Sequence, residues 1–167
     1  MDVITYIKTQ FIGLRERQSR VTLVGITDEQ INRIPPSGAN KIGAILLHAI
    51  QGEDLFIQKF FQEKPLVWES QCWSEKIGIP DPPSGDRGWE EARLTDLKLA
   101  PILEYHQAVC VETDDYLTSL TAEVLDREVP FFGYQVPIAY LLINLTEHTA
   151  EHLGEIAALR GILETKQ

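Results

Sequence analysis

The chain has 167 residues, of which 44% are hydrophobic and 24% charged, which is typical of one globular domain spanning residues 1–167. Fifteen basic against 25 acidic residues give a net charge of −10, which disfavours binding to nucleic acid or to an anionic membrane. No apolar run approaches the roughly 20 residues of a membrane-spanning helix, and the N-terminal segment lacks signal-peptide features. We therefore expect a cytoplasmic protein in which Cys72 and Cys110 are free, buried or semi-buried thiols.

The first third of the chain has helical periodicity. Apolar residues recur every three or four positions over 4–21, broken only by Gln18, which predicts an amphipathic helix that ends in VTLVGI. Thr27 is a candidate N-cap for a short helical turn, which Pro35 and Pro36 would stop.

A second helix is expected to begin within residues 37–40 and to end near Glu63. The segment 64–89 is rich in proline and glycine, and this composition predicts a long connection with one helical turn around 68–76.

A third helix is predicted to begin near Thr95 or Ala100 and to end near Leu120, with its start uncertain between these positions because of Pro101. TAEVLDREV is interpreted as a short turn and PFFGYQV as a loop. Pro137 then opens a last helix that runs to about Leu163. Four long helices with one extended crossover predict an all-α fold, a four-helix bundle, without strands.

The last helix carries two histidines on its apolar stripe. Ile138, Leu141 and Leu145 precede His148 and His152 at steps of three or four, and the stripe then continues through Ile156, Leu159 and Leu163. Side chains four residues apart share one face of a helix, so both imidazoles can reach a common ion. Alternatively, each histidine is a core-edge residue whose nitrogens bond to neighbouring carbonyls or carboxylates.

A third histidine, His48, lies midway along the second predicted helix. Gly52 follows one turn later and is unfavourable in a helix interior, so it either leaves room beside His48 or allows close packing against a neighbouring helix. Three histidines from two helices would leave coordination positions open, as in catalytic rather than structural metal sites. Zinc suits these ligands best, and nickel, cobalt, manganese and iron are alternatives.

Other polar residues are weaker candidates. His106 is expected to face inward in a structural role, with contact to a ligand histidine or to substrate as the alternative. The carboxylates that could orient a histidine or act as a general base are Glu53, Glu147, Glu151 and Glu155. A row of small residues on the last helix, Ala150, Gly154, Ala158 and Gly161, favours close helix packing within the bundle or across a homodimer.

These motifs resemble the DinB-like superfamily, metal-binding four-helix bundles that include the YfiT-like proteins and the bacillithiol- and mycothiol-dependent transferases. The matching segments are ILLHAIQGEDLF, GITDEQINRIPPSG and EHTAEHLGEIAALRG. The resemblance implies that His48, His148 and His152 are ligands of a divalent metal ion. Glu155 departs from the family pattern, which frequently has glutamine there.

The resemblance also implies an activity on a small-molecule substrate. Characterised relatives transfer a low-molecular-weight thiol to an electrophile or isomerise a substrate with a thiol cofactor, so we expect thiol transfer. Metal-dependent hydrolysis and a non-catalytic, stress-related metal-binding role are the alternatives. A thiol transferase would also need a cation to recognise the carboxylates of the thiol, and the candidates are Arg15, Arg17, Lys41, Arg87 and Arg160.

Overall fold

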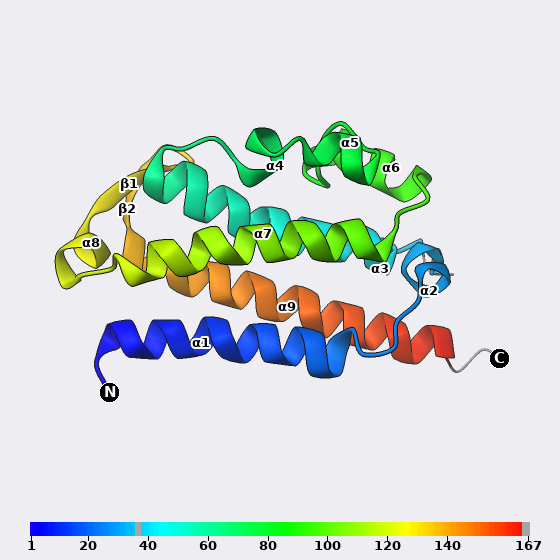
Figure 1. The fold of residues 1–167 in the computed structure, drawn as a ribbon, viewed down its shortest axis with the longest axis horizontal. Helices are drawn as coiled ribbons and strands as arrows, with labels where there is room; N and C mark the ends of the chain where they lie inside the picture. Colours follow the sequence, from blue (N-terminus) through cyan, green and yellow to red (C-terminus); the bar gives the residue numbers. More distant parts are fainter. Residues whose placement is uncertain (36–37, 165–167) are drawn as a thin grey trace.

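Four long helices run alongside one another in the computed structural model, which describes residues 1–35 and 38–164 (Figure 1). They are α1 (Val3–Arg17), α3 (Ile42–Asp54), α7 (Leu99–Thr118) and α9 (Ile138–Glu164). The predicted all-α four-helix bundle is therefore confirmed, and the long crossover connects α3 to α7 across one side of the molecule.

The first helix ends much as its periodicity predicts. α1 continues without a break into a π-helical turn, η1 (Gln18–Thr22), before the chain bends. Thr27 does cap the short helix α2 (Asp28–Asn32), since its hydroxyl accepts from the Gln30 N–H at 3.3 Å and its own N–H donates to Gln30 Oε1 at 2.9 Å. The predicted stop at Pro36 and the earliest predicted start of the next helix, at Ser37, lie outside the described residues.

α3 is the central helix of the bundle. Every residue in it except His48 is buried, which fits a segment that is apolar almost all around its circumference. It starts a few residues later than predicted and continues as a π-helix, η2 (Leu55–Phe61). His48 is therefore the one point on α3 that reaches toward solvent.

The crossover holds more helix than the single predicted turn, and that prediction was wrong. It contains α4 (Val67–Ser70), α5 (Trp73–Ile77) and α6 (Gly85–Leu94). These helices are too short to display a full apolar stripe, so periodicity could not reveal them.

The buried carboxylate of Asp54 fixes the start of the crossover. Its oxygens accept hydrogen bonds from the backbone N–H groups of Val67 at 2.9 Å and Trp68 at 3.0 Å, and from the Tyr105 hydroxyl at 2.7 Å. One side chain of α3 thus satisfies two free N–H groups at the N-terminus of α4 and binds α7 as well.

The segment after α7 differs from the prediction. α7 begins at Leu99, so Pro101 falls in its first turn, where its missing N–H costs no hydrogen bond. The short helix α8 (Ala122–Asp126) is followed by an antiparallel hairpin of β1 (Glu128–Phe131) and β2 (Tyr134–Pro137). The prediction of no strand was wrong here, because Phe132 (φ 46°) and Gly133 (φ 87°) make a two-residue turn of the kind that joins strands.

The apolar core forms two clusters at different levels along the bundle. One contains Ile45 of α3, Ile102 of α7 and Ile156 of α9, and the other contains Phe61 of η2, Leu117 of α7 and Leu141 of α9. The polar side chains at the intermediate level include Gln18, Glu53 and Thr113, which are buried, and the half-buried His148 and His152. A polar layer therefore crosses the bundle between the two clusters.

Some surface features also bear on the predictions. Cys72 and Cys110 are free, as predicted, but Cys72 is exposed rather than buried. A Cβ added at Gly154 would meet no neighbouring atom within 4 Å among the described residues, so this part of the small-residue row of α9 faces open space there, and the homodimer stays a prediction. None of the helices within 1–35 and 38–164 is both long and apolar enough to span a membrane.

The Asp54→Asn substitution should destabilise the fold by about 1–3 kcal/mol, because the amide cannot accept from both backbone N–H groups and one would remain buried without a partner. Chemical denaturation monitored by circular dichroism measures the free energy of unfolding. The matched control, Asp115→Asn on the exposed side of α7, should change it by less than about 0.5 kcal/mol. Equal effects of the two substitutions would contradict the anchoring role of Asp54.

Candidate metal centre

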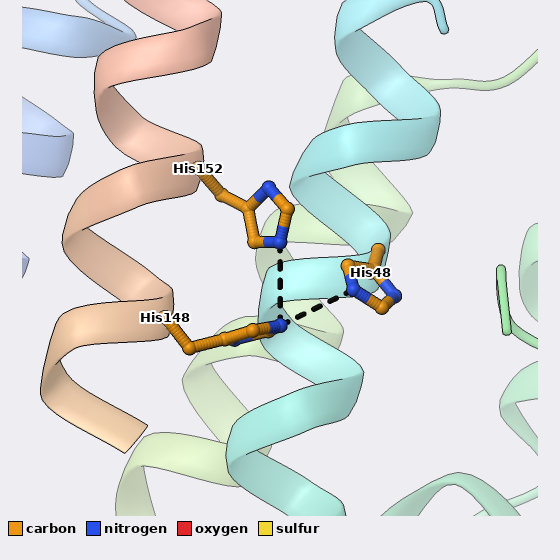
Figure 2. A group of neighbouring side chains, drawn as sticks. All are labelled: His48, His148 and His152. Atoms are coloured by element: carbon orange, nitrogen blue, oxygen red, sulfur yellow. Dashed lines mark hydrogen bonds between the residues drawn. The ribbon is translucent and has the colours of Figure 1, made fainter. Parts of the chain in front are cut away.

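The structure brings three histidines of the polar layer together between α3 and α9 (Figure 2). The Nε2 atom of His148 lies 3.2 Å from Nε2 of His48 and 3.2 Å from Nε2 of His152. His148 and His152 come from successive turns of α9, and His48 meets them from α3. The described residues contain one group of three such side chains that could hold a metal ion, and it is this one.

The outer two histidines have their Nδ1 atoms bonded to oxygen acceptors. His48 Nδ1 lies 2.6 Å from the carbonyl oxygen of Pro83, and His152 Nδ1 lies 3.0 Å from Oε2 of Glu155. A carbonyl or carboxylate oxygen can only accept, so each Nδ1 carries the proton. Each Nε2 therefore presents a lone pair toward His148, an arrangement common among metal-binding histidines.

The spacing from His148 Nε2 to each of the other two suits a single ion, and the three ligand atoms all lie within 4.8 Å of one another. Nitrogen ligands about 2.1 Å from an ion, at angles between 90° and 110°, lie about 3.0–3.4 Å from each other. The two distances of 3.2 Å from His148 fall in this range. Because all three rings are only partly buried, an ion held there would be within reach of solvent.

The local environment keeps His148 and His48 neutral, which is the state that binds metals. Burial lowers the pKa of His148 to about 4, and the neighbouring His152 and His48 lower it further in the same direction. Burial also lowers the pKa of His48, against the effect of its hydrogen bond to Pro83. A metal ion would therefore displace no proton from either ring at neutral pH.

Gly52 makes the space for His148. A Cβ at this position would lie 2.8 Å from Cε1 and 3.1 Å from Nδ1 of the His148 ring, closer than van der Waals contact allows. The two interpretations of Gly52, room for a histidine and close packing of a neighbouring helix, describe the same contact. α9 packs closely against α3 here, and its side chain beside Gly52 is the His148 ring.

Sequence reasoning missed Pro83 and Trp89, two residues of the crossover that contact His48. The Trp89 ring centroid lies 4.8 Å from that of His48, and Pro83 supplies the carbonyl described above. Neither residue has a spacing that relates it to a histidine 35 or more positions earlier, so no sequence signal could have found them.

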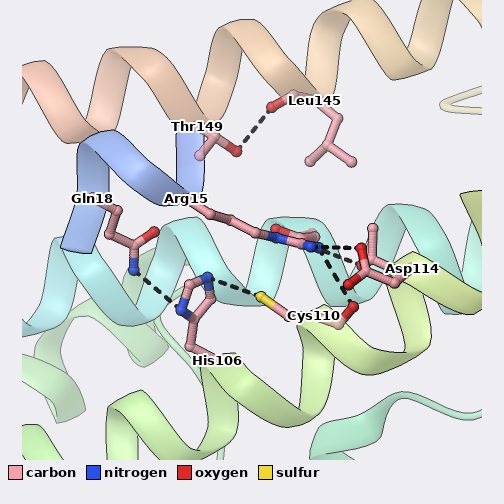
Figure 3. A network of polar contacts seen from close by, with 9 residues as sticks. Arg15, Gln18, His106, Cys110, Asp114, Leu145 and Thr149 are labelled. Atoms are coloured by element: carbon pink, nitrogen blue, oxygen red, sulfur yellow. Dashed lines mark hydrogen bonds and ion pairs between the residues drawn. The ribbon is translucent and has the colours of Figure 1, made fainter. Parts of the chain in front are cut away.

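Two other predicted candidates, Glu53 and His106, lie in a separate network of polar contacts, which Figure 3 draws in part. Glu53 accepts from the Thr113 hydroxyl at 2.7 Å and from Arg15 Nη2 at 3.1 Å, and Arg15 also pairs with Asp114 at 2.6 Å. Glu53 is therefore bonded to α1 and α7 and makes no hydrogen bond to the three histidines in the described part of the chain.

His106 hydrogen-bonds to Gln18 and Cys110, and its structural role stays a prediction. Its Nδ1 accepts from the Gln18 amide at 3.3 Å, so its Nε2 donates to Cys110 Sγ at 3.4 Å (Figure 3). Burial raises the pKa of the Cys110 thiol to about 12, so this cysteine stays protonated and is no nucleophile.

Comparison with known proteins assigns the family. The sequence model of the DinB superfamily matches residues 11–156, and the chain belongs to this superfamily. A solved structure described as the conserved protein of locus from Enterococcus faecalis is similar over 99% of both chains, with a TM-score of 0.83 and 21% sequence identity, which shows a shared fold. Among curated proteins, none matches the sequence.

The Gly52→Ala substitution should raise the pKa of His148 from about 4 toward the ordinary value of 6.5, because the added methyl group would push the ring out toward water. An NMR titration of the metal-free protein that follows the His148 Cε1 proton measures this pKa. Gly13→Ala is the control, because a Cβ on that glycine of α1 meets nothing within 4 Å. An unchanged His148 pKa in Gly52→Ala would show that Gly52 does not set the ring position.

Proposed function

We propose that His48, His148 and His152 bind one divalent metal ion through their Nε2 atoms. The convergence of three nitrogens on a single point carries this proposal. A neutral His148 can place at most one proton on Nε2, and that proton can satisfy only one of the two lone pairs that face it. A cation between the rings satisfies all three lone pairs at once.

The ligand type supports zinc as the ion. Three imidazoles with open positions suit zinc best, and nickel, cobalt, manganese and iron also accept such ligands. Glu155, on the surface of α9, would orient His152 and increase the basicity of its Nε2 by accepting the Nδ1 proton. This gives Glu155 a positioning role despite its departure from the glutamine common in the family.

We further propose that the centre serves transfer of a low-molecular-weight thiol to an electrophilic small molecule. A bound divalent ion would lower the pKa of the thiol and so favour its nucleophilic thiolate form. The chain's own part would be to hold His48 and His148 neutral and to leave one side of the centre open. Trp89, half-buried against His48, would form an apolar wall beside the reacting groups.

The structure also narrows the choice of the cation that would recognise the thiol's carboxylates. Arg15 is held by Glu53 and Asp114, and the Lys41 ammonium donates to Asn32 and to the backbone of Thr95 inside the fold. Arg87 lies on α6, the helix that brings Trp89 to His48, and its side chain is 80% exposed, with one bond to Glu91. Arg87 is therefore the best-supported candidate of the three.

Removing a group that only orients a metal ligand typically weakens metal binding by roughly 10- to 100-fold. Replacing a ligand itself should weaken it by more, and the variants to test are His48→Ala, His148→Ala and His152→Ala. Calorimetric titration of chelator-treated, untagged protein with Zn²⁺ measures affinity and stoichiometry, and circular dichroism checks that the helices persist. The control variant His106→Ala should still bind one ion with near wild-type affinity. Loss of binding in His106→Ala alone would refute this ligand set.

The loaded protein should consume a model electrophile only when the metal and a thiol such as glutathione or bacillithiol are both present. The assay follows thioether formation with and without each component. Cleavage of esters or amides in the absence of thiol would instead support the hydrolase alternative. Inactivity in both assays, with a melting temperature unaffected by chelation, would support a non-catalytic role.

A further inference from the structure

We infer that Gly88 is a positioning residue of the metal centre, acting through the backbone of Pro82 and Pro83 to hold His48 in the tautomer that presents Nε2. This inference rests on the proposed metal site, and it assigns the control of one ligand to a residue of the crossover. Three observations carry it.

The first observation is the bond from His48 to the crossover. His48 Nδ1 donates to the Pro83 carbonyl at 2.6 Å, and no other hydrogen bond orients this ring apart from its contact with His148 in the described residues. If the carbonyl moved away, Nδ1 would lose the acceptor that keeps its proton there. The proton could then occupy Nε2, and a protonated Nε2 cannot bind a metal ion.

The second observation is the close approach of α6 to this carbonyl's backbone. A Cβ added at Gly88 would lie 2.7 Å from the Pro82 carbonyl oxygen and 3.4 Å from Cα of Pro83. Both of these are backbone atoms, which cannot swing aside as the end of a flexible side chain can. A side chain at position 88 would therefore push the Pro82–Pro83 segment away from α6.

The third observation is that this glycine lies inside a helix. Gly88 occupies the first part of α6, where alanine would be the better helix former. Its φ does not fall in the left-handed region, so no backbone conformation demands glycine here. The close approach of α6 to Pro82 is the contact that requires glycine at position 88.

The geometry also explains why Gly88 differs from a glycine that only packs. The next residue, Trp89, places its ring against His48, so α6 and the Pro82–Pro83 segment contact the same imidazole at two points. If the Pro82–Pro83 segment shifts relative to α6, the hydrogen bond from His48 to Pro83 changes and the ring contact with Trp89 does not. The ring would turn, even where the helices keep their places.

The test compares wild type, Gly88→Ala and the control Gly13→Ala. Proton–nitrogen correlation spectra of the metal-free protein report the tautomer of His48, and Co²⁺ titration reports affinity and the ligand-field spectrum. Wild type and Gly13→Ala should show the Nδ1–H tautomer. Gly88→Ala should show partial protonation at Nε2, a Co²⁺ affinity reduced by about 10- to 100-fold, and an altered spectrum, even with unchanged helical content.

The outcomes separate this inference from the proposed function. A wild-type tautomer, affinity and spectrum in Gly88→Ala would overturn the role of Gly88 and leave the metal centre standing. A tautomer shift in Gly88→Ala, in a protein whose wild type binds no metal, would uphold the positioning role and refute the metal centre. If Gly88→Ala does not fold, Pro82→Gly loosens the same backbone and should give the same tautomer shift, and a wild-type tautomer there would overturn the inference.

Discussion

Three imidazole nitrogens meet inside the helical bundle, and the surrounding helices must hold them together. Lone pairs 3.2 Å apart repel unless a proton or a cation lies between them, so the arrangement persists only if the surrounding helices hold it. The bundle does so with α3, buried along its length, and with α9, whose histidines take positions that apolar residues would otherwise fill.

The histidines belong to the polar layer. Burying its polar side chains costs free energy, and hydrogen bonds within the bundle offset that cost. Glu53 is buried one residue after Gly52, and it would be strongly unfavourable without its bonds to Arg15 and Thr113. The buried Gln18 side chain is satisfied in turn by its hydrogen bond to the half-buried His106. Hydrophobic clusters on either side of the layer supply the stability that lets the bundle tolerate it.

The crossover connects this layer to the exterior of the bundle. Its start is fixed by Asp54, and near its end the Leu97 N–H donates to the side chain of Asn32 at 2.9 Å. Between these two anchors it brings Pro83 and Trp89 to His48. Composition alone predicts a long connection here, yet the segment forms one wall of the site. Connections that rigid helices hold in place commonly have such a role.

The sequence by itself determined which face of each helix is apolar, because a period of 3.6 residues is visible without any partner helix. That period placed His148 and His152 on one inward face, and it predicted the four long helices. It could not show that His48 meets them, and the resemblance to the DinB superfamily supplied that expectation instead. The hairpin at 128–137 was missed because four-residue strands carry too short a pattern.

Only the tertiary structure decided what lies opposite each of these faces. Glu53 reaches Arg15 rather than a histidine, Glu155 rather than Glu147 or Glu151 orients His152, and Gly52 gives room to a ring from another helix. Contacts of this kind join residues far apart in the sequence, such as His48 and His148, which are 100 positions apart. Local periodicity carries no information about such pairs, because the packing of whole helices sets them.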